Sequence, residues 1–142
     1  ADVRFATPDS QFGIPATKLG LGYEYTGSAA LARLVGPSHA RDILFSARLL
    51  SSDEAHRIGL INFVVDKDEL EVRVREYAQQ IATRAPLTLK LFKESINQFE
   101  SNPEDRDYEL LKNMVDACFS SSDYKEGRLA FMEKRTPNFT GT

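Results

Sequence analysis

The sequence predicts an α/β chain that is mostly helical and carries only a few short strands. Strand-like segments, with alternating or β-branched residues, are residues 2–6, 11–14 and 61–65, and a brief extended stretch is expected at residues 48–50. From residue 67 onward, apolar residues recur at helical spacing almost without interruption. Three short strands are too few for an independently stable sheet, so we expect them to belong to a larger sheet.

The composition is that of an ordinary globular protein and excludes several classes. Hydrophobic residues make up 42% of the 142 residues, and the net charge is −3, so no excess of basic residues is available for nucleic acid. No apolar run is long enough to cross a membrane. His39 and His56 are isolated, and the single Cys118 can form neither an internal disulfide nor a thiolate metal site. We therefore expect a cytoplasmic protein without a metal or redox cofactor and without a nucleic-acid or membrane partner.

The first residues have the pattern of an internal segment. Residues 1–6 alternate in polarity as a strand does, and the sequence does not begin with Met. Together with the incomplete set of strands, this pattern predicts that the sequence is the C-terminal part of a longer subunit.

Start and stop signals divide the first half into short elements. Glycines punctuate residues 20–27, which we expect to form a loop. A helix is predicted from Ser28 to the Gly36–Pro37 pair, and Ser38 can begin a second helix.

A capping box follows, with a hydroxyl at Ser51 and a carboxylate three residues later at Glu54. The short helix that it opens is expected to end at Gly59, before the strand over residues 61–65.

The remaining residues predict four helices. Their expected starts are near Leu70, at Pro86, at Asn102–Pro103 and at Ser122. The last helix is expected to end before Pro137, which would break it. The apolar faces of these helices exceed what so small a core can cover, so we expect them to pack on a neighbouring subunit or on residues outside this sequence.

Three segments in order resemble one family. They are residues 12–21 with 31–36 (FGIPATKLGL and LARLVG), residues 50–65 (LSSDEAHRIGLINFVV) and residues 124–135 (YKEGRLAFMEKR). At this order and spacing, over nearly the whole chain, the sequence resembles the C-terminal half of an enoyl-CoA hydratase/isomerase subunit of the crotonase superfamily.

The resemblance implies a crotonase-type β-β-α spiral fold, the fold class also called ClpP/crotonase. Residues 1–66 would be the C-terminal part of the spiral core, and residues 67–142 a helical region for trimerisation and CoA binding. The implied assembly is a homotrimer or hexamer. The implied substrate is an acyl-CoA thioester whose enolate the enzyme stabilises through two backbone N–H groups. Coenzyme A would enter as part of the substrate, with no separate cofactor.

The sequence departs from the hydratases of this family at a catalytic position. Ala16 occupies the place of the family's second catalytic Glu, the residue after the proline of the Phe-Gly-x-Pro motif. An alanine cannot transfer a proton, so hydration by two carboxylates cannot operate in its usual form. The first catalytic Glu and both oxyanion-hole donors would lie upstream of Ala1. Ala16 itself could line an apolar acyl pocket.

The loop before the predicted Ser28 helix offers a substitute carboxylate. In related aryl-CoA dehalogenases a catalytic carboxylate lies at the position of Glu24, so this resemblance makes Glu24 the candidate acid, base or nucleophile. Tyr23 and Tyr25 are candidates for orienting substrate or lining the acyl pocket. The simpler alternatives are a surface glutamate without a role and two tyrosines that pack within the loop.

Near the C-terminus, Phe131 and Lys134 lie three residues apart, which predicts that they share a helix face. In hydratases of the family, the matching aromatic and lysine hold the adenine and phosphates of CoA. The alternative is a core phenylalanine beside a solvated lysine.

These observations predict an acyl-CoA-processing enzyme of the enoyl-CoA hydratase/isomerase family. If Glu24 works alone, isomerisation, decarboxylation or thioester hydrolysis fits better than hydration. The rival is a non-catalytic acyl-CoA-binding or scaffold protein with the same fold. A purely helical interaction domain is a third possibility, which the strand-like segments argue against.

Overall fold

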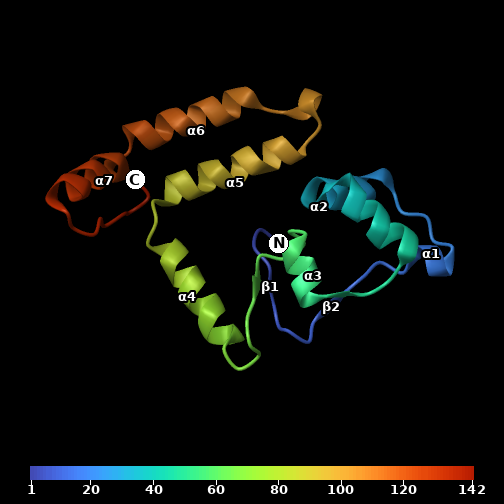
Figure 1. The fold of residues 1–142 in the computed structure, drawn as a ribbon. Coiled ribbons are helices and arrows are strands. Elements are labelled where there is room, and N and C mark those ends of the chain that lie inside the picture. The colour runs from blue at the N-terminus through green and yellow to red at the C-terminus, as the bar shows by residue number, and fades with distance from the viewer. The chain divides into compact units, whose positions relative to one another are not determined.

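The computed structural model describes residues 1–142, which fold as two compact units, Ala1–Arg75 and Glu76–Thr142 (Figure 1). The boundary between the units falls inside the helix α4, Leu70–Ala82. The assignment of different roles to residues 1–66 and 67–142 stays a prediction, because compactness alone does not report function.

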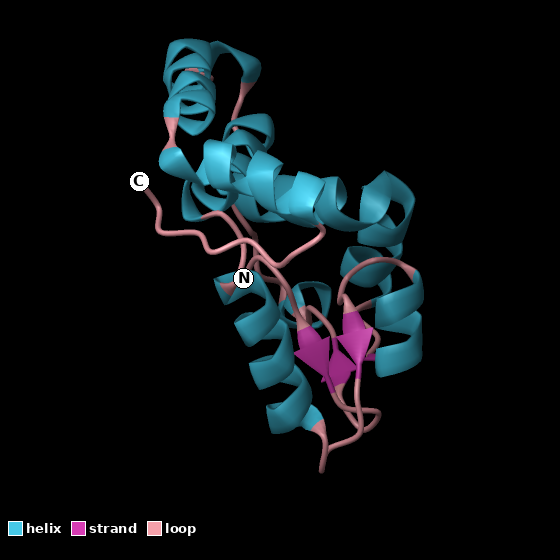
Figure 2. Ribbon diagram, turned by 90° about the vertical axis from the view of Figure 1, so that its left-hand side faces the viewer, coloured by secondary structure: helices cyan, strands magenta, loops and turns pink.

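The first unit contains two pairs of two-residue strands, drawn in magenta in Figure 2. Strand β1, Phe5–Ala6, pairs in parallel with β4, Phe63–Val64, and the rings of Phe5 and Phe63 stack with centroids 4.7 Å apart. Strand β2, Gln11–Phe12, pairs antiparallel with β3, Leu50–Ser51. The three expected strands are therefore present as β1, β2 and β4, each shorter than its sequence pattern predicts, and β3 overlaps the extended stretch expected at residues 48–50 only at Leu50.

The predicted loop over residues 20–27 is only partly a loop. The helix α2, Tyr25–Ser46, begins three residues before Ser28. A four-residue helix that the sequence did not predict, α1, Ala16–Leu19, precedes it. Gly20 closes α1 in the left-handed conformation, φ 64°, and its N–H donates to the Ala16 carbonyl. One turn of helix is too short to produce a periodic apolar pattern, which explains why α1 was not predicted.

The predicted break in the middle of α2 is confirmed. Gly36 has φ 80° and ψ 154°, so the helix consists of two segments that meet at a kink before Pro37. A side chain at position 36 would strain this conformation, whereas glycine adopts it readily. The kink lets both segments contribute to one core, in which Val35, Ile43 and Leu50 are buried.

The helix α3, Ser52–Arg57, has only half of the predicted capping box. The Ser51 hydroxyl accepts the Glu54 N–H at 3.3 Å, as expected. The Glu54 carboxylate, however, accepts hydrogen bonds from the Arg48 guanidinium at 2.8 and 2.5 Å instead of turning back to the Ser51 N–H. The predicted stop at Gly59 is confirmed, because this residue has φ 79° and its N–H donates to the His56 carbonyl.

The last helices are α5, Pro86–Glu100, α6, Tyr108–Ser120, and α7, Ser122–Glu133, and α5 and α6 lie side by side (Figure 1). The prediction that Asn102 and Pro103 begin a helix is wrong in part: Pro103–Asp105 is only a 3₁₀ turn, η1. Helix α6 begins later because the Asp107 carboxylate caps it, accepting the Leu110 N–H at 2.8 Å.

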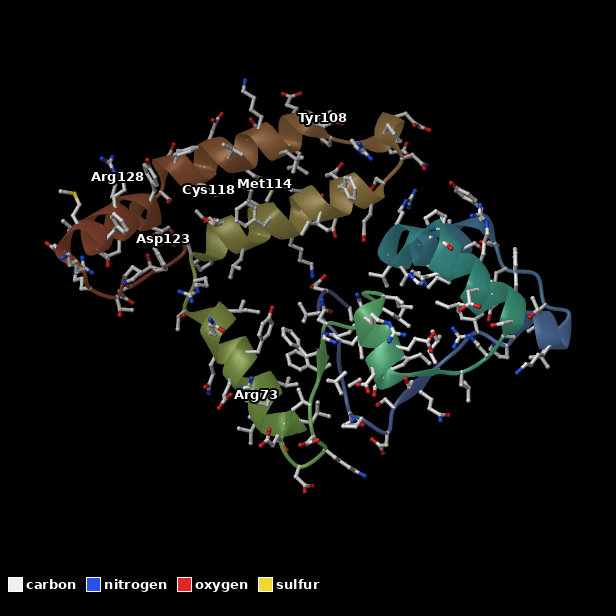
Figure 3. All side chains as sticks on the ribbon, in the orientation of Figure 1. Arg73, Tyr108, Met114, Cys118, Asp123 and Arg128 are labelled. Atoms are coloured by element: carbon white, nitrogen blue, oxygen red, sulfur yellow. The ribbon has the colours of Figure 1, made fainter.

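The C-terminal residues fold back on α7. The Asp123 carboxylate, only 4% exposed, accepts the N–H groups of Thr140 and Gly141 at 2.7 and 2.9 Å. Figure 3 places Asp123 where α7 begins. A Cβ atom on Gly127 would lie 3.4 Å from the Phe139 ring, so this glycine allows Phe139 to lie close against the helix.

Candidate functional site

The candidate catalytic segment runs from Ala16 to Glu24, through helix α1 and the turn that joins α1 to α2. Ala16 begins α1 and is 5% exposed. The Leu21 N–H donates to the Ala16 carbonyl at 3.0 Å, so the chain turns sharply after α1. The turn leads directly to Glu24, which is the N-cap residue of α2. Ala16 and Glu24 are therefore linked by one short, hydrogen-bonded stretch of chain.

Glu24 combines exposure with an uncommitted carboxylate. Its backbone is extended, φ −63° and ψ 156°, and its carbonyl accepts the Gly27 N–H at 3.2 Å. Its side chain makes no cap hydrogen bond, and the whole residue is exposed. At a helix N-terminus the unpaired N–H groups favour negative charge. The carboxylate is thus free to meet a ligand at this end of α2.

Tyr23 and Tyr25 do not pack into the protein. They flank Glu24, and Tyr25 is 76% exposed. Leu19 and Leu21, on the same segment, are exposed as well. Tyr23 is 54% exposed, so both residues remain largely accessible. An exposed carboxylate between large apolar side chains is an arrangement that can orient an apolar substrate, but the roles of these residues stay predictions.

Phe131 and Lys134 lie at the end of α7, and the prediction of a shared helix face is wrong. Phe131 is helical and 86% exposed, which excludes a core phenylalanine. Lys134 caps the helix in the left-handed conformation, φ 55° and ψ 38°, and therefore leaves the helical path. The Lys134 N–H still donates to the Phe131 carbonyl at 3.3 Å. The two residues are thus joined by a backbone bond at an exposed helix end.

The second unit also contains an apolar cavity that no sequence motif indicated. Its volume is about 730 Å³, within the range of small-molecule pockets. Residues of α5, α6, α7 and the C-terminal segment line it, among them Leu91, Cys118, Phe131 and Phe139. Figure 3 shows Met114 and Cys118 on α6 where it runs beside α5. In the sequence, only the excess of apolar residues on these helices hinted at an apolar cavity.

Two further observations concern the whole chain. No three His, Cys, Asp or Glu side chains gather in an arrangement that could hold a metal ion. None of the helices combines the length and the apolar character that a bilayer-spanning segment requires.

Comparisons with known proteins agree with the motifs. The profile of the family described as Enoyl-CoA hydratase/isomerase matches residues 1–142. The chain is 38% identical to crotonyl-CoA hydratase of Syntrophomonas wolfei, covering 97% of this chain and 53% of that protein. It is 33% identical to methylmalonyl-CoA decarboxylase of Escherichia coli, covering 99% of this chain and 55% of that protein.

The fold agrees as well. A crystal structure of an enoyl-CoA hydratase/carnitine racemase from Magnetospirillum magneticum matches with a TM-score of 0.87 and 31% identity, over 100% of this chain and 52% of the other. The chain thus spans about half the length of the relatives named here. The crotonase-type fold class is confirmed, as a mostly helical piece with few strands. Because the family profile extends over every residue, the chain belongs to the enoyl-CoA hydratase/isomerase family.

Proposed function

We propose that the protein containing this chain processes acyl-CoA thioesters through an enolate, with Glu24 as its proton-transfer group. The observation that carries this proposal is the exposed, unpartnered Glu24 carboxylate at the start of α2, in a chain that matches the family over its whole length. Coenzyme A would enter with the substrate, so no separate cofactor is proposed. A chain with a single cysteine suits a reducing compartment, and we propose a cytoplasmic location.

The chemistry follows from what one carboxylate can do. The Glu24 carboxylate would take the proton from the carbon next to the thioester carbonyl, and the carbonyl oxygen would carry the enolate charge. Return of that proton to a different carbon gives an isomer. Backbone N–H groups outside these 142 residues would stabilise the oxygen, as the family resemblance implies.

Ala16 argues against two-carboxylate hydration as the reaction. It is buried at the start of α1 and has no group that can hold a water molecule or move a proton. The related proteins named as a hydratase and as a decarboxylase share comparable identity with this chain, so identity does not choose between their reactions. Glu24 alone fits isomerisation, decarboxylation or thioester hydrolysis better than hydration.

The end of α7 is the proposed CoA contact. Phe131 is largely exposed, so its ring can stack on an adenine, and Lys134 adds a positive charge that can meet a phosphate. The proposed assembly is a homotrimer or hexamer. Its support is a row of exposed apolar side chains on α5, namely Phe92, Ile96 and Phe99, against which a neighbouring subunit could pack.

Exchange of one carboxylate tests the catalytic proposal. Glu24→Gln keeps the size of the side chain and removes the proton acceptor, so kcat should fall about 10²- to 10⁴-fold on the true substrate. Steady-state kinetics with a 3-enoyl-CoA would measure this, because its α-carbon carries the proton that Glu24 would take. Methylmalonyl-CoA would be the second substrate, because its decarboxylation leaves an enolate that must be protonated. Glu104→Gln, at an exposed glutamate in the 3₁₀ turn, is the matched control and should leave kcat unchanged.

The same measurement separates the rival function. Unchanged turnover in Glu24→Gln would remove Glu24 from the mechanism. The scaffold alternative rests on Ala16, and it would replace the enzyme if the unaltered protein bound CoA but turned over none of a panel of acyl-CoA esters.

A further inference from the structure

The turn after α7 fixes the backbone of Lys134. The left-handed conformation is strained for a residue other than glycine, so the surroundings must enforce it. The Lys134 N–H donates to the carbonyls of Ala130 and Phe131, and the Arg135 N–H donates to the Ala130 carbonyl at 3.0 Å. These bonds satisfy the last carbonyls of the helix. The position from which the Lys134 side chain departs is therefore set by the helix end.

Arg135 engages the two carboxylates beside this turn. Its guanidinium donates to both oxygens of Glu126 at 2.6 and 2.9 Å, and its Nε donates to Glu133 at 2.6 Å. Glu126 also accepts the Asn138 N–H at 2.9 Å, so the segment that follows Arg135 is tied to α7. The bidentate geometry is the stronger form of an arginine–carboxylate contact.

Lys134 is left without an acidic partner. It is exposed and forms no ion pair, although Glu133 is its neighbour in the sequence. We propose that Arg135 keeps the Lys134 ammonium available to an anion by holding both Glu126 and Glu133. Arg135 would thereby act as a positioning residue for the phosphate groups of a CoA ester. This inference rests on the CoA contact proposed for Lys134.

Electrostatics gives the reason. Lys134, Arg135, Glu126 and Glu133 together carry no net charge, and the loss of Arg135 would leave two unpaired carboxylates, one of them on the residue that precedes Lys134. Glu126 is ionised at neutral pH, because hydrogen bonds from Arg135 and then from the Asn138 N–H lower its pKa to about 2. Released carboxylates would attract the ammonium and repel a phosphate.

Titration of CoA into the protein as its gene encodes it, followed by calorimetry, tests this role. Arg135→Gln should weaken CoA binding about two- to fivefold, the usual contribution of an exposed ion pair. The triple variant Arg135→Gln, Glu126→Gln, Glu133→Gln removes the released charges together with the arginine, so it should recover most of the lost affinity. A purely structural role for the pairing would not produce this recovery.

Two further variants keep the outcomes apart. Lys134→Gln should weaken CoA binding at least as much as Arg135→Gln, and unchanged binding would overturn the proposed CoA contact itself. Arg75→Gln, which breaks the exposed pair with Glu71 on α4, controls for the loss of one ion-paired arginine and should change nothing. If Lys134→Gln weakens binding but Arg135→Gln does not, or if the triple variant stays as weak as Arg135→Gln, the role assigned to Arg135 is wrong.

Discussion

Two arginines in this chain each hold two carboxylates, with different consequences. Arg48 donates to Asp42 at 2.6 Å and to both oxygens of Glu54, whereas Arg135 donates to Glu126 and Glu133. The two arginine side chains are almost equally exposed, at 41% and 39%. Their chemistry is therefore matched, and only the elements that they connect differ.

Arg48 connects separate elements. Asp42 lies on the second segment of α2 and Glu54 on α3, so Arg48 joins two helices that flank the buried Leu50 of strand β3. Arg135 instead ties a turn to the helix that precedes it. An arginine between two acids thus reinforces packing in the first unit, and in the second it leaves a neighbouring lysine unpaired. Both arginines bond two carboxylates, so the bonds alone do not distinguish an arginine that joins helices from one that keeps a lysine unpaired.

The largest expected effect concerns the backbone beneath Arg48. A Cβ atom on Gly13 would lie 2.8 Å from the Arg48 carbonyl oxygen, closer than real contacts allow. Gly13→Ala must therefore push apart the segments that β2 and β3 bring together, and we expect it to lower the free energy of unfolding by about 1–3 kcal/mol. Urea denaturation followed by circular dichroism would measure the change.

A second glycine is the control for this substitution. Gly27 lies in the first turn of α2, and a Cβ atom added there would meet no atom from elsewhere in the chain within 4 Å. Gly27→Ala should therefore be neutral or stabilising by up to about 1 kcal/mol. If both variants lost the same free energy of unfolding, the close approach of Gly13 to the Arg48 carbonyl would not be the cause of the loss.

A smaller effect is expected from Arg48 itself. Arg48→Gln removes the link between α2 and α3 but leaves the core side chains in place, so stability should fall by less than in Gly13→Ala. Arg135→Gln should change the melting temperature less still, because it frees only a turn at the end of one helix. Differential scanning calorimetry of both variants would measure this. If Arg135→Gln lowered the melting temperature more than Arg48→Gln, then Arg135 and not Arg48 would be the arginine that stabilises packing.

The same two regions show what the sequence could and could not predict. Gly36 and Gly59 were readable because each acts through its own backbone, and the cap at Ser51 was readable because its hydroxyl accepts an N–H only three residues away. The partner of Glu54 was not readable: the capping pattern pairs the carboxylate with a local donor, the Ser51 N–H, whereas it accepts from an arginine six residues earlier. Side-chain pairing depends on tertiary geometry that a local pattern does not contain.

The candidate site divides in the same way. The family motifs pointed to Glu24, and its position at the N-cap of α2 agrees with a loop that leads into a helix. The helical spacing of Phe131 and Lys134 failed because Lys134 has left the helix, and helix ends are the least readable feature of a sequence. The apolar cavity could not be predicted, because it needs residues of three helices and the C-terminal segment to be brought together.

The smallest expected effect is on pH dependence, and it tests whether both arginines hold their acids in solution. Hydrogen bonds from Arg48 lower the pKa of Glu54, and those from Arg135 lower the pKa of Glu126 to about 2. A carboxylate with a lowered pKa stabilises the fold fully above its unfolded value, near 4.5, and this contribution is lost as the pH falls toward the folded value. Carboxylate NMR titration should therefore place the Glu126 midpoint near pH 2, and Arg135→Gln should raise it toward 4.5. Because Arg135→Gln leaves Glu54 bonded to Arg48, the Glu54 midpoint should not move. A Glu126 midpoint near 4.5 in the unaltered protein would mean that the pair is open in solution, and Arg135 could then not hold that carboxylate away from Lys134.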